Sequence, residues 1–171
     1  MDDAIEVVDY DPSWSCRFEL EKTQILEALA PDKVDIQHIG STSVIGLAAK
    51  PIIDILVGVS QLPPTTAQIA TLEQLGYLYQ GELGIPGRHF FRKGNPRTHH
   101  LHLVLPESEI WEKHLLFRDF LRKHPAAREQ YEALKRQLAM QYRLDRDGYV
   151  TGKSFLIEKL LAQARAWQLT W

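Results

Sequence analysis

The stretch HIGSTSVIGLAAKPIIDIL, residues 38–56, decides the fold of this chain and raises its main functional question. Its last part belongs to PIIDILVGV (51–59), which carries apolar residues on both faces and is therefore predicted to be a central strand of a covered sheet. Asp54 is the one carboxylate in that strand. A buried carboxylate is costly unless it is paired, hydrogen-bonded or bound to a metal ion. Asp54 is therefore either a structural ion-pair partner, of Lys50 or an arginine such as Arg88, or a ligand.

Size and composition limit what the chain can be. Its 171 residues are 44% hydrophobic and 25% charged, which predicts a single globular domain over residues 1–171. The order of its predicted strands and helices makes this an α+β domain. No apolar run approaches the roughly 20 residues of a spanning helix, so no membrane is expected. The formal charge of −2 argues against a nucleic-acid partner. One cysteine, Cys16, excludes an intrachain disulfide and favours a cytoplasmic location.

The surrounding sequence predicts a mixed sheet with early helices and a helical C-terminal third from about residue 107. Turn residues and the change from alternating to helical spacing mark the boundaries. The predicted strands are 4–10, 34–39, 51–59, 77–80 and a hairpin of 88–93 with 99–105. The predicted helices run from Asp11-Pro12 to Pro31, from Thr65 to Gly76, over 108–123, over 126–143, and onward from Thr151.

Two segments carry residues suited to binding an anion. Gly40-Ser41-Thr42-Ser43 (40–43) follows a strand and precedes a short helical turn, so its N–H groups and hydroxyls can cradle a phosphate, although an ordinary capped turn has the same pattern. TGKS (151–154) lacks the spacing of a P-loop and follows no strand. With Thr151 as N-cap, Lys153 would oppose the helix dipole, and a bound anion would offset that penalty.

The strand HHLHLVL (99–105) adds histidines at alternate positions. Strand geometry places His100 and His102 on one face, where both can ligate one metal ion or donate to one phosphate. The alternative is that one histidine packs and the other is solvated. If this strand lies beside that of Asp54, the combined carboxylate and imidazole ligands would accept Mg²⁺, Mn²⁺ or Zn²⁺.

Several motifs together resemble the GrpB family. They are, in order, HIGSTSVIGLAAKPIIDI, GIPGRHFFRKG, THHLHLVL, HLLFRDFLRKHP, YEALKRQLA and YVTGKSFLIEKL. The resemblance starts at IEVVDYDPSW (5–14) and covers nearly the whole chain, with Ile45 in place of the family's usual proline in STSVPGL. It implies the nucleotidyltransferase fold: a mixed β-sheet with flanking helices.

In active members of that fold, a Gly-Ser turn holds the nucleotide phosphates, and carboxylates in an Asp-x-Asp pair and on a neighbouring strand bind two Mg²⁺ ions. The resemblance matches Gly40-Ser41 to the turn and Asp54 to one carboxylate. Leu56 and Ile52 stand where the second carboxylate would be, and histidines replace the third.

The resemblance and the residues together lead to two functional hypotheses. The first is an enzyme that binds a nucleotide or other phosphate-bearing ligand and transfers a nucleotidyl or phosphoryl group to a small molecule. The alternative is a non-catalytic domain that binds a nucleotide or protein and regulates a partner enzyme such as dephospho-CoA kinase, to which the family is found fused. In the enzyme hypothesis, the phosphate-binding residues are Gly40, Ser41, Ser43, Lys50, Arg88, Arg118 and Lys153, the divalent-metal ligands are Asp54, His100 and His102, and the catalytic residues are Asp54 and His102.

Overall fold

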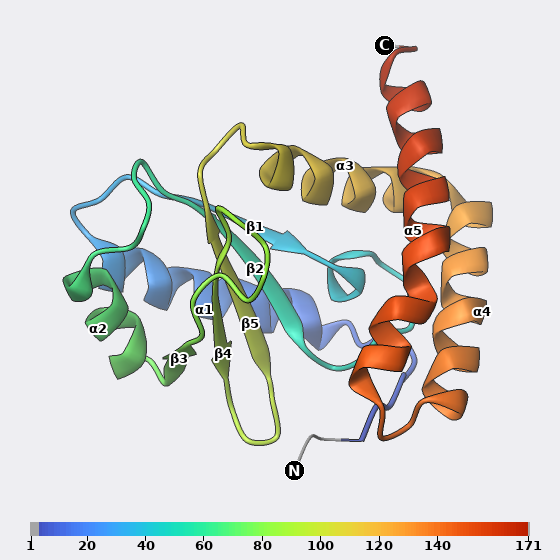
Figure 1. The fold of residues 1–171 in the computed structure, drawn as a ribbon, viewed down its shortest axis with the longest axis horizontal. Helices are drawn as coiled ribbons and strands as arrows, with labels where there is room; N and C mark the ends of the chain where they lie inside the picture. The colour runs from blue at the N-terminus through green and yellow to red at the C-terminus, as the bar shows by residue number, and fades with distance from the viewer. Residues whose placement is uncertain (1–3, 171) are drawn as a thin grey trace.

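The computed structural model describes residues 4–170 as a five-stranded mixed sheet flanked by helices (Figure 1). The predicted α+β class with a helical C-terminal third is confirmed. In chain order the elements are α1 (Ser13–Leu29), β1 (Asp35–Ile39), the 3₁₀ turn η1 (Ser41–Ser43), β2 (Ile53–Gly58), α2 (Thr66–Gln74), β3 (Tyr77–Tyr79), β4 (His89–Lys93), β5 (His99–Val104), α3 (Glu109–Lys123), α4 (Pro125–Gln141) and α5 (Arg146–Gln168).

The sheet has the order β1-β2-β5-β4-β3, and only the β2–β5 pair is parallel among the described strands. Parallel neighbours need a crossover rather than a tight turn, and here α2, β3 and β4 supply it. The predicted central position of β2 is confirmed, because it lies between β1 and β5. Its register places Asp54 opposite His100 on β5 and opposite Ile39 on β1.

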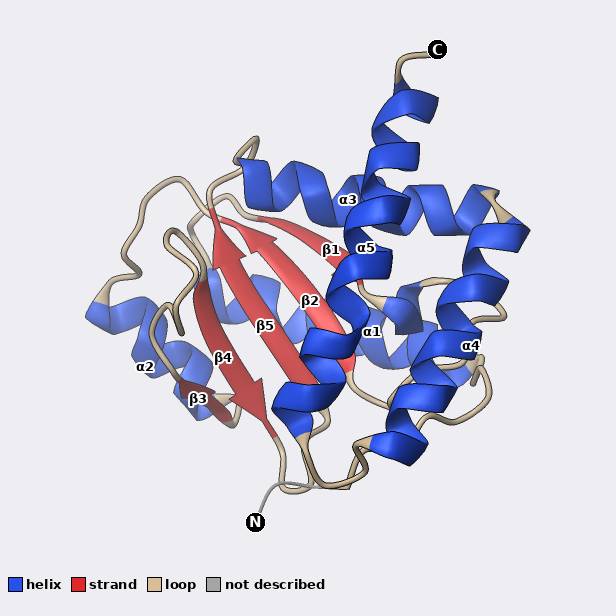
Figure 2. Ribbon diagram, turned by 45° about the vertical axis from the view of Figure 1, so that its right-hand side comes forward, coloured by secondary structure: helices blue, strands red, loops and turns tan. Residues whose placement is uncertain are grey.

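The two faces of the sheet are covered differently (Figure 2). Helices α1 and α2 pack on one face over a continuous apolar core that includes Ile53, Ile55 and Val57 of β2. On the other face, Trp111 of α3 covers only the end of the sheet near Leu56. The rest of that face carries Asp54 of β2 with His100 and His102 of β5, and it lies toward α4 and α5. This half-covered face therefore leaves Asp54 and its two histidine neighbours beside a space between the sheet and the C-terminal helices.

Two sequence-based boundaries were wrong. Residues 4–10 form no strand and contribute only the isolated bridge between Val8 and Ala49. The last helix begins at Arg146 rather than Thr151, because Asp145 caps it by accepting a hydrogen bond from the Gly148 amide. Lys153 therefore lies about two turns inside α5 and does not oppose the dipole at a helix start.

Gly152, in the first half of α5, has a packing role. A Cβ on Gly152 would lie 2.6 Å from the Leu138 side chain of α4, so glycine allows α4 and α5 to approach closely. Across residues 4–170, none of the helices has the length and apolar character that a bilayer crossing requires.

Candidate functional site

Asp54 is held by the two histidines of the neighbouring strand. Its Oδ1 lies 3.2 Å from His100 Nδ1 and 3.5 Å from His102 Nε2. Burial alone would raise the pKa of this carboxyl, but the hydrogen bonds from the two imidazoles outweigh it and hold the pKa well below its ordinary value. Among the described residues, Asp54 forms no ion pair with Lys50 or Arg88, and the hydrogen bonds of its side chain go to the two imidazoles.

Both histidines are buried, so the alternative interpretation, in which one of them packs and the other is solvated, is wrong. His100 is 9% exposed and His102 is 8% exposed. Burial lowers the pKa of His100, so its neutral form is favoured despite the neighbouring carboxylate. An ionised carboxylate only accepts hydrogen bonds, so the nitrogens that face Asp54 carry the ring protons. The opposite nitrogens, His100 Nε2 and His102 Nδ1, are buried and have no hydrogen-bond partner.

A third histidine, missed in the sequence, completes this polar patch. His114 of α3 lies beside His102, with the ring centroids 5.6 Å apart. Burial, followed by the nearby charge of His102, lowers the pKa of His114 to about 4. The helix that carries it was predicted, but the approach of α3 to the sheet was not.

Gly40 brings the turn after β1 directly against Asp54. Its φ of +71° favours glycine, and a Cβ there would lie 2.7 Å from Asp54 Oδ2. Ser41 and Ser43, which follow it, point to different places. Ser41 Oγ accepts a hydrogen bond of 2.9 Å from Lys135 Nζ, whereas Ser43 Oγ donates back to the Gly40 carbonyl. Only the Ser41 hydroxyl therefore faces the side on which Asp54 lies.

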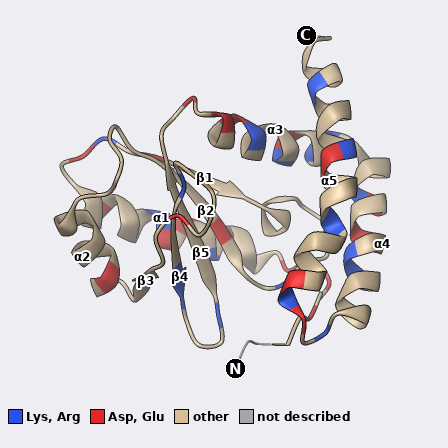
Figure 3. Ribbon diagram, in the orientation of Figure 1, with Lys and Arg blue, Asp and Glu red and all other residues tan. Residues whose placement is uncertain are grey.

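A cavity of about 240 Å³ lies between this turn, β2, β5 and the helices α4 and α5. Most of the predicted phosphate-binding residues line this cavity, together with Asp54, His100 and further residues of α4 and α5. Figure 3 shows Lys and Arg at several positions along both helices. The residues that line it include Gly40, Ser41, Lys50, Asp54, His100, Tyr131, Lys135, Arg146, Tyr149 and Lys153.

The lysines of this cavity are largely shielded from water. Burial, more than any neighbouring charge, lowers the pKa of Lys50 and of Lys153 to about 8 and that of Lys135 to about 7. Lys50 and Lys153 lie over the Tyr149 ring, with Nζ 5.0 and 4.4 Å from its centroid. Repulsion from other basic groups adds to the depression of all three pKa values. A bound anion would relieve this strain, because it favours the charged form of each lysine.

Lys135 is the main residue that sequence reasoning missed. It is only 2% exposed, and it donates to Ser41 Oγ and to the Ala48 carbonyl. A signal was present, since the buried face of α4 runs through Ala127, Tyr131 and Leu138, and Lys135 interrupts this apolar spacing.

Three predicted phosphate-binding residues lie outside the cavity lining. The Arg88 guanidinium stacks on Phe90, 5.2 Å from the ring centroid, and donates to the Glu82 carbonyl. Ser43 lines a separate cavity of about 270 Å³ on the opposite side of the turn. Arg118 also lies outside the lining of the basic cavity.

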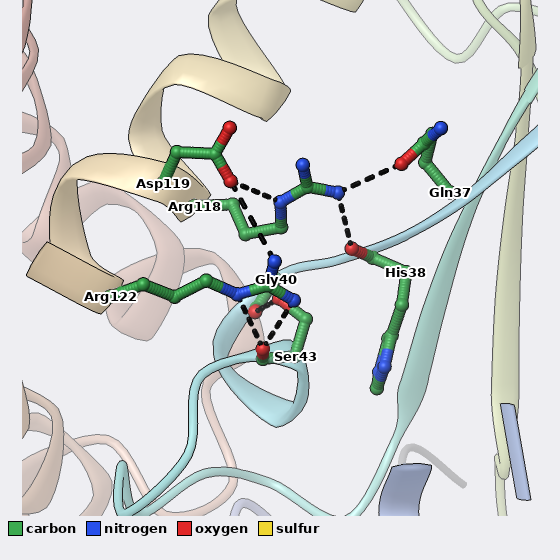
Figure 4. Close-up of polar contacts among 7 residues, drawn as sticks. All are labelled: Gln37, His38, Gly40, Ser43, Arg118, Asp119 and Arg122. Carbon is green, nitrogen blue, oxygen red and sulfur yellow. Dashed lines mark hydrogen bonds and ion pairs between the residues drawn. The ribbon is translucent and has the colours of Figure 1, made fainter. Parts of the chain in front are cut away.

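Arg118 and its neighbour on α3 hold the backbone of the turn instead (Figure 4). Arg118 donates to the His38 carbonyl and to Gln37, and its Nε pairs with Asp119 at 2.7 Å. Arg122 donates twice to the Ser43 carbonyl, at 3.0 and 2.8 Å. These contacts position the turn rather than a ligand.

The predicted metal ligands Asp54, His100 and His102 lie on the neighbouring strands β2 and β5. Asp54, His100 and His102 converge, but their facing atoms hydrogen-bond to one another. Over the described residues, 4–170, no group of three or more His, Cys, Asp or Glu side chains is placed to hold a metal ion. The two Mg²⁺ ions that the fold implies also need a second carboxylate, and Leu56 is fully buried in apolar contacts instead. The residues present therefore do not fit a two-metal centre.

A larger hollow of about 700 Å³ lies between α3 and α5, but it carries none of the predicted site residues. The basic cavity beside Asp54 is therefore the candidate site.

Comparisons with known proteins agree with this fold. Residues 4–163 match the model of a family described as "GrpB protein". The UPF0157 protein YqkA of Bacillus subtilis is 39% identical over 96% of this chain but only 48% of its own length. The Glutamate-rich protein GrpB of Alkalihalophilus pseudofirmus is 35% identical, over 91% of this chain and 92% of its own.

Solved structures give the same result. The crystal structure of the conserved protein GrpB from Enterococcus faecalis superposes with a TM-score of 0.88 at 38% identity, covering 95% of this chain and 99% of that one. A cytoplasmic RNA terminal U-transferase is 11% identical, with a TM-score of 0.51. The match covers 77% of this chain and 40% of that one. Cid1 in complex with its short product ApU is 14% identical, with a TM-score of 0.52. The match covers 85% of this chain and 48% of the Cid1 chain. At such identities the last two show the fold alone.

Proposed function

The chain belongs to the GrpB family, and from this and the basic cavity we propose that it binds a nucleotide or another phosphate-bearing small molecule. This binding proposal depends mainly on one observation: Lys50, Lys135 and Lys153 line one cavity beside the Gly40-Ser41 turn. Ammonium groups that gather around a single lining carboxylate, next to the Ser41 hydroxyl and the backbone of the turn, are chemically suited to phosphate oxygens. The cavity volume suits a phosphate chain rather than a whole nucleotide, so the rest of the ligand would extend outside it.

A transfer reaction is the finer form of this proposal. A nucleotide whose phosphates occupy the cavity would lie beside Asp54, and Asp54 with His102 are the predicted catalytic residues. The depressed pKa of Asp54 keeps it ionised, and it orients both imidazoles of β5. The donor set around Asp54 does not fit the two-ion centre of the fold, so Asp54 and His102 would act here without such a centre.

One observation favours a second candidate, a non-catalytic regulatory domain. Leu56 stands where the fold's second catalytic carboxylate would be, and His100 and His102 stand where an acid would be expected on the neighbouring strand. The Bacillus relative is also about twice the length of the matched region, so such a domain can belong to a longer protein. A partner enzyme such as dephospho-CoA kinase is the proposed client. The cytoplasm is the proposed compartment for either function, in keeping with the single cysteine of the chain.

The binding proposal is tested by isothermal titration calorimetry with ATP, GTP, CTP, UTP and inorganic pyrophosphate. At least one of them is expected to bind to the wild type, and Lys153→Met is expected to weaken it about tenfold or more, because a charge-assisted contact contributes about 1.5–3 kcal/mol. Lys159→Met is the matched control, since this exposed lysine lies on the same helix outside the cavity. Equal affinities for the wild type and Lys153→Met would refute the assignment of the site.

Turnover separates the two candidate functions. The protein is incubated with each nucleoside triphosphate, Mg²⁺ or Mn²⁺ and a metabolite mixture, and the products are analysed by mass spectrometry. A nucleotidylated or phosphorylated product that is lost in Asp54→Ala supports the transferase. Binding without any product supports the regulatory domain.

A further inference from the structure

The hydrogen bonds of Asp54 compete directly with metal binding. Both His100 Nδ1 and His102 Nε2 need a proton to donate to Asp54 Oδ1. A metal ion binds only the unprotonated nitrogen of an imidazole. The same atoms therefore cannot stabilise Asp54 and coordinate an ion. An ion between the three side chains would have to displace both hydrogen bonds.

The outer nitrogens offer no better site. His100 Nε2 and His102 Nδ1 are unpartnered, but each lies on the side of its ring away from Asp54. An ion bound there would have imidazole ligands without the carboxylate. Among residues 4–170, no group of three or more His, Cys, Asp or Glu side chains is placed to hold a metal ion.

The charge of the cavity also opposes a dication. Asp54 is the only acidic side chain among the described residues that line it, against Lys50, Lys135 and Lys153. The lysines come from three different segments: the loop before β2, α4 and α5. Because like charges repel, a divalent cation is disfavoured here and a phosphate is favoured.

We propose that Lys50, Lys135 and Lys153 take the place that divalent cations hold in two-metal nucleotidyltransferase sites, so that phosphate groups bind here without a divalent metal ion. This inference rests on the proposed phosphate-binding function and concerns how the same cavity neutralises its ligand. Lys135, fixed by Ser41 Oγ and the Ala48 carbonyl, lies at the turn. Lys50 and Lys153 share the Tyr149 ring and can move toward a ligand, because the ring contact is non-directional compared with a hydrogen bond.

The test measures the binding of inorganic pyrophosphate by calorimetry, in EDTA and separately in excess Mg²⁺ or Mn²⁺. The wild type, Lys50→Met, Lys153→Met and the control Lys159→Met are compared. Thermal unfolding without ligand shows whether each variant is folded. Methionine keeps the length of the buried stem, so the cavity variants are expected to fold.

The inference predicts that the wild type binds pyrophosphate in EDTA and that Mg²⁺ does not improve the affinity. Each cavity variant is expected to bind at least tenfold more weakly in EDTA, while the control is unchanged. Binding that is tenfold or more tighter with Mg²⁺ or Mn²⁺ than in EDTA would overturn the inference and leave the phosphate-binding function standing. If neither pyrophosphate nor any nucleotide binds in any condition, the proposed function itself fails, and this inference fails with it.

Discussion

Lys135→Met is expected to change the pH dependence of stability in a direction that the structure fixes. Lys135 is 2% exposed, and burial, followed by the charge of Lys153, lowers its pKa from the ordinary 10.5 to about 7. Between these two values the unfolded chain binds a proton that the folded protein does not. The stability of the wild type therefore rises with pH across this window, and methionine removes that contribution.

The size of the effect follows from the pKa shift. Each pH unit inside the window is worth about 1.4 kcal/mol of unfolding free energy. Between pH 6 and pH 9, the wild type should therefore gain about 2–3 kcal/mol relative to Lys135→Met, or about 5–10 °C in melting temperature. The variant also loses the hydrogen bonds to Ser41 and Ala48, which lowers its stability by a similar amount at each pH and leaves the slope unchanged.

Urea unfolding followed by tryptophan fluorescence at pH 6, 7.5 and 9 measures the difference. Lys159→Met, at an exposed position on α5, serves as the control and should show no such trend. If the difference between the wild type and Lys135→Met is the same at all three pH values, Lys135 keeps its ordinary pKa. The description of the cavity as a desolvated cationic site would then be refuted.

Three further substitutions test other parts of the structure. Gly40→Ala should lose about 1–2 kcal/mol more stability in thermal melts than Gly46→Ala, since both have positive φ but only Gly40 would clash with a neighbour; equal losses would argue against the close contact. Glu21→Gln should cost about 2–3 kcal/mol in urea unfolding, because this buried carboxylate pairs with Lys93 at 2.7 Å; a change below about 0.5 kcal/mol would show that the pair contributes little. Arg122→Lys should cost about 0.5–1 kcal/mol and speed amide hydrogen exchange in the turn, since lysine cannot reproduce its double donation to one carbonyl; unchanged exchange would remove its positioning role.

The local parts of the site could be predicted from the sequence. Alternation placed His100 and His102 on one face of β5, and the apolar residues around Asp54 indicated that β2 is central. Both inferences depend on spacings of one or two residues, which the geometry of a strand fixes by itself.

The parts of the site that depend on contacts between distant segments could not be predicted from the sequence. Basic residues near the motifs, such as Arg88 and Arg118, were predicted to contact phosphate, yet they bind backbone carbonyls outside the cavity. Lys135, 94 positions after Ser41, meets it directly. Which cation reaches the turn depends on where α4 docks, and no local pattern encodes that position.

The sequence by itself determined the fold class, the central strand with its lone carboxylate and the glycine turn that precedes it. Only the tertiary structure decided the details around Asp54: which imidazole nitrogens face it, and that Lys135 of α4 joins Lys50 and Lys153 in one cavity. The physical reason is that backbone geometry follows from neighbouring residues, whereas the charge of a cavity is the sum over segments that packing brings together.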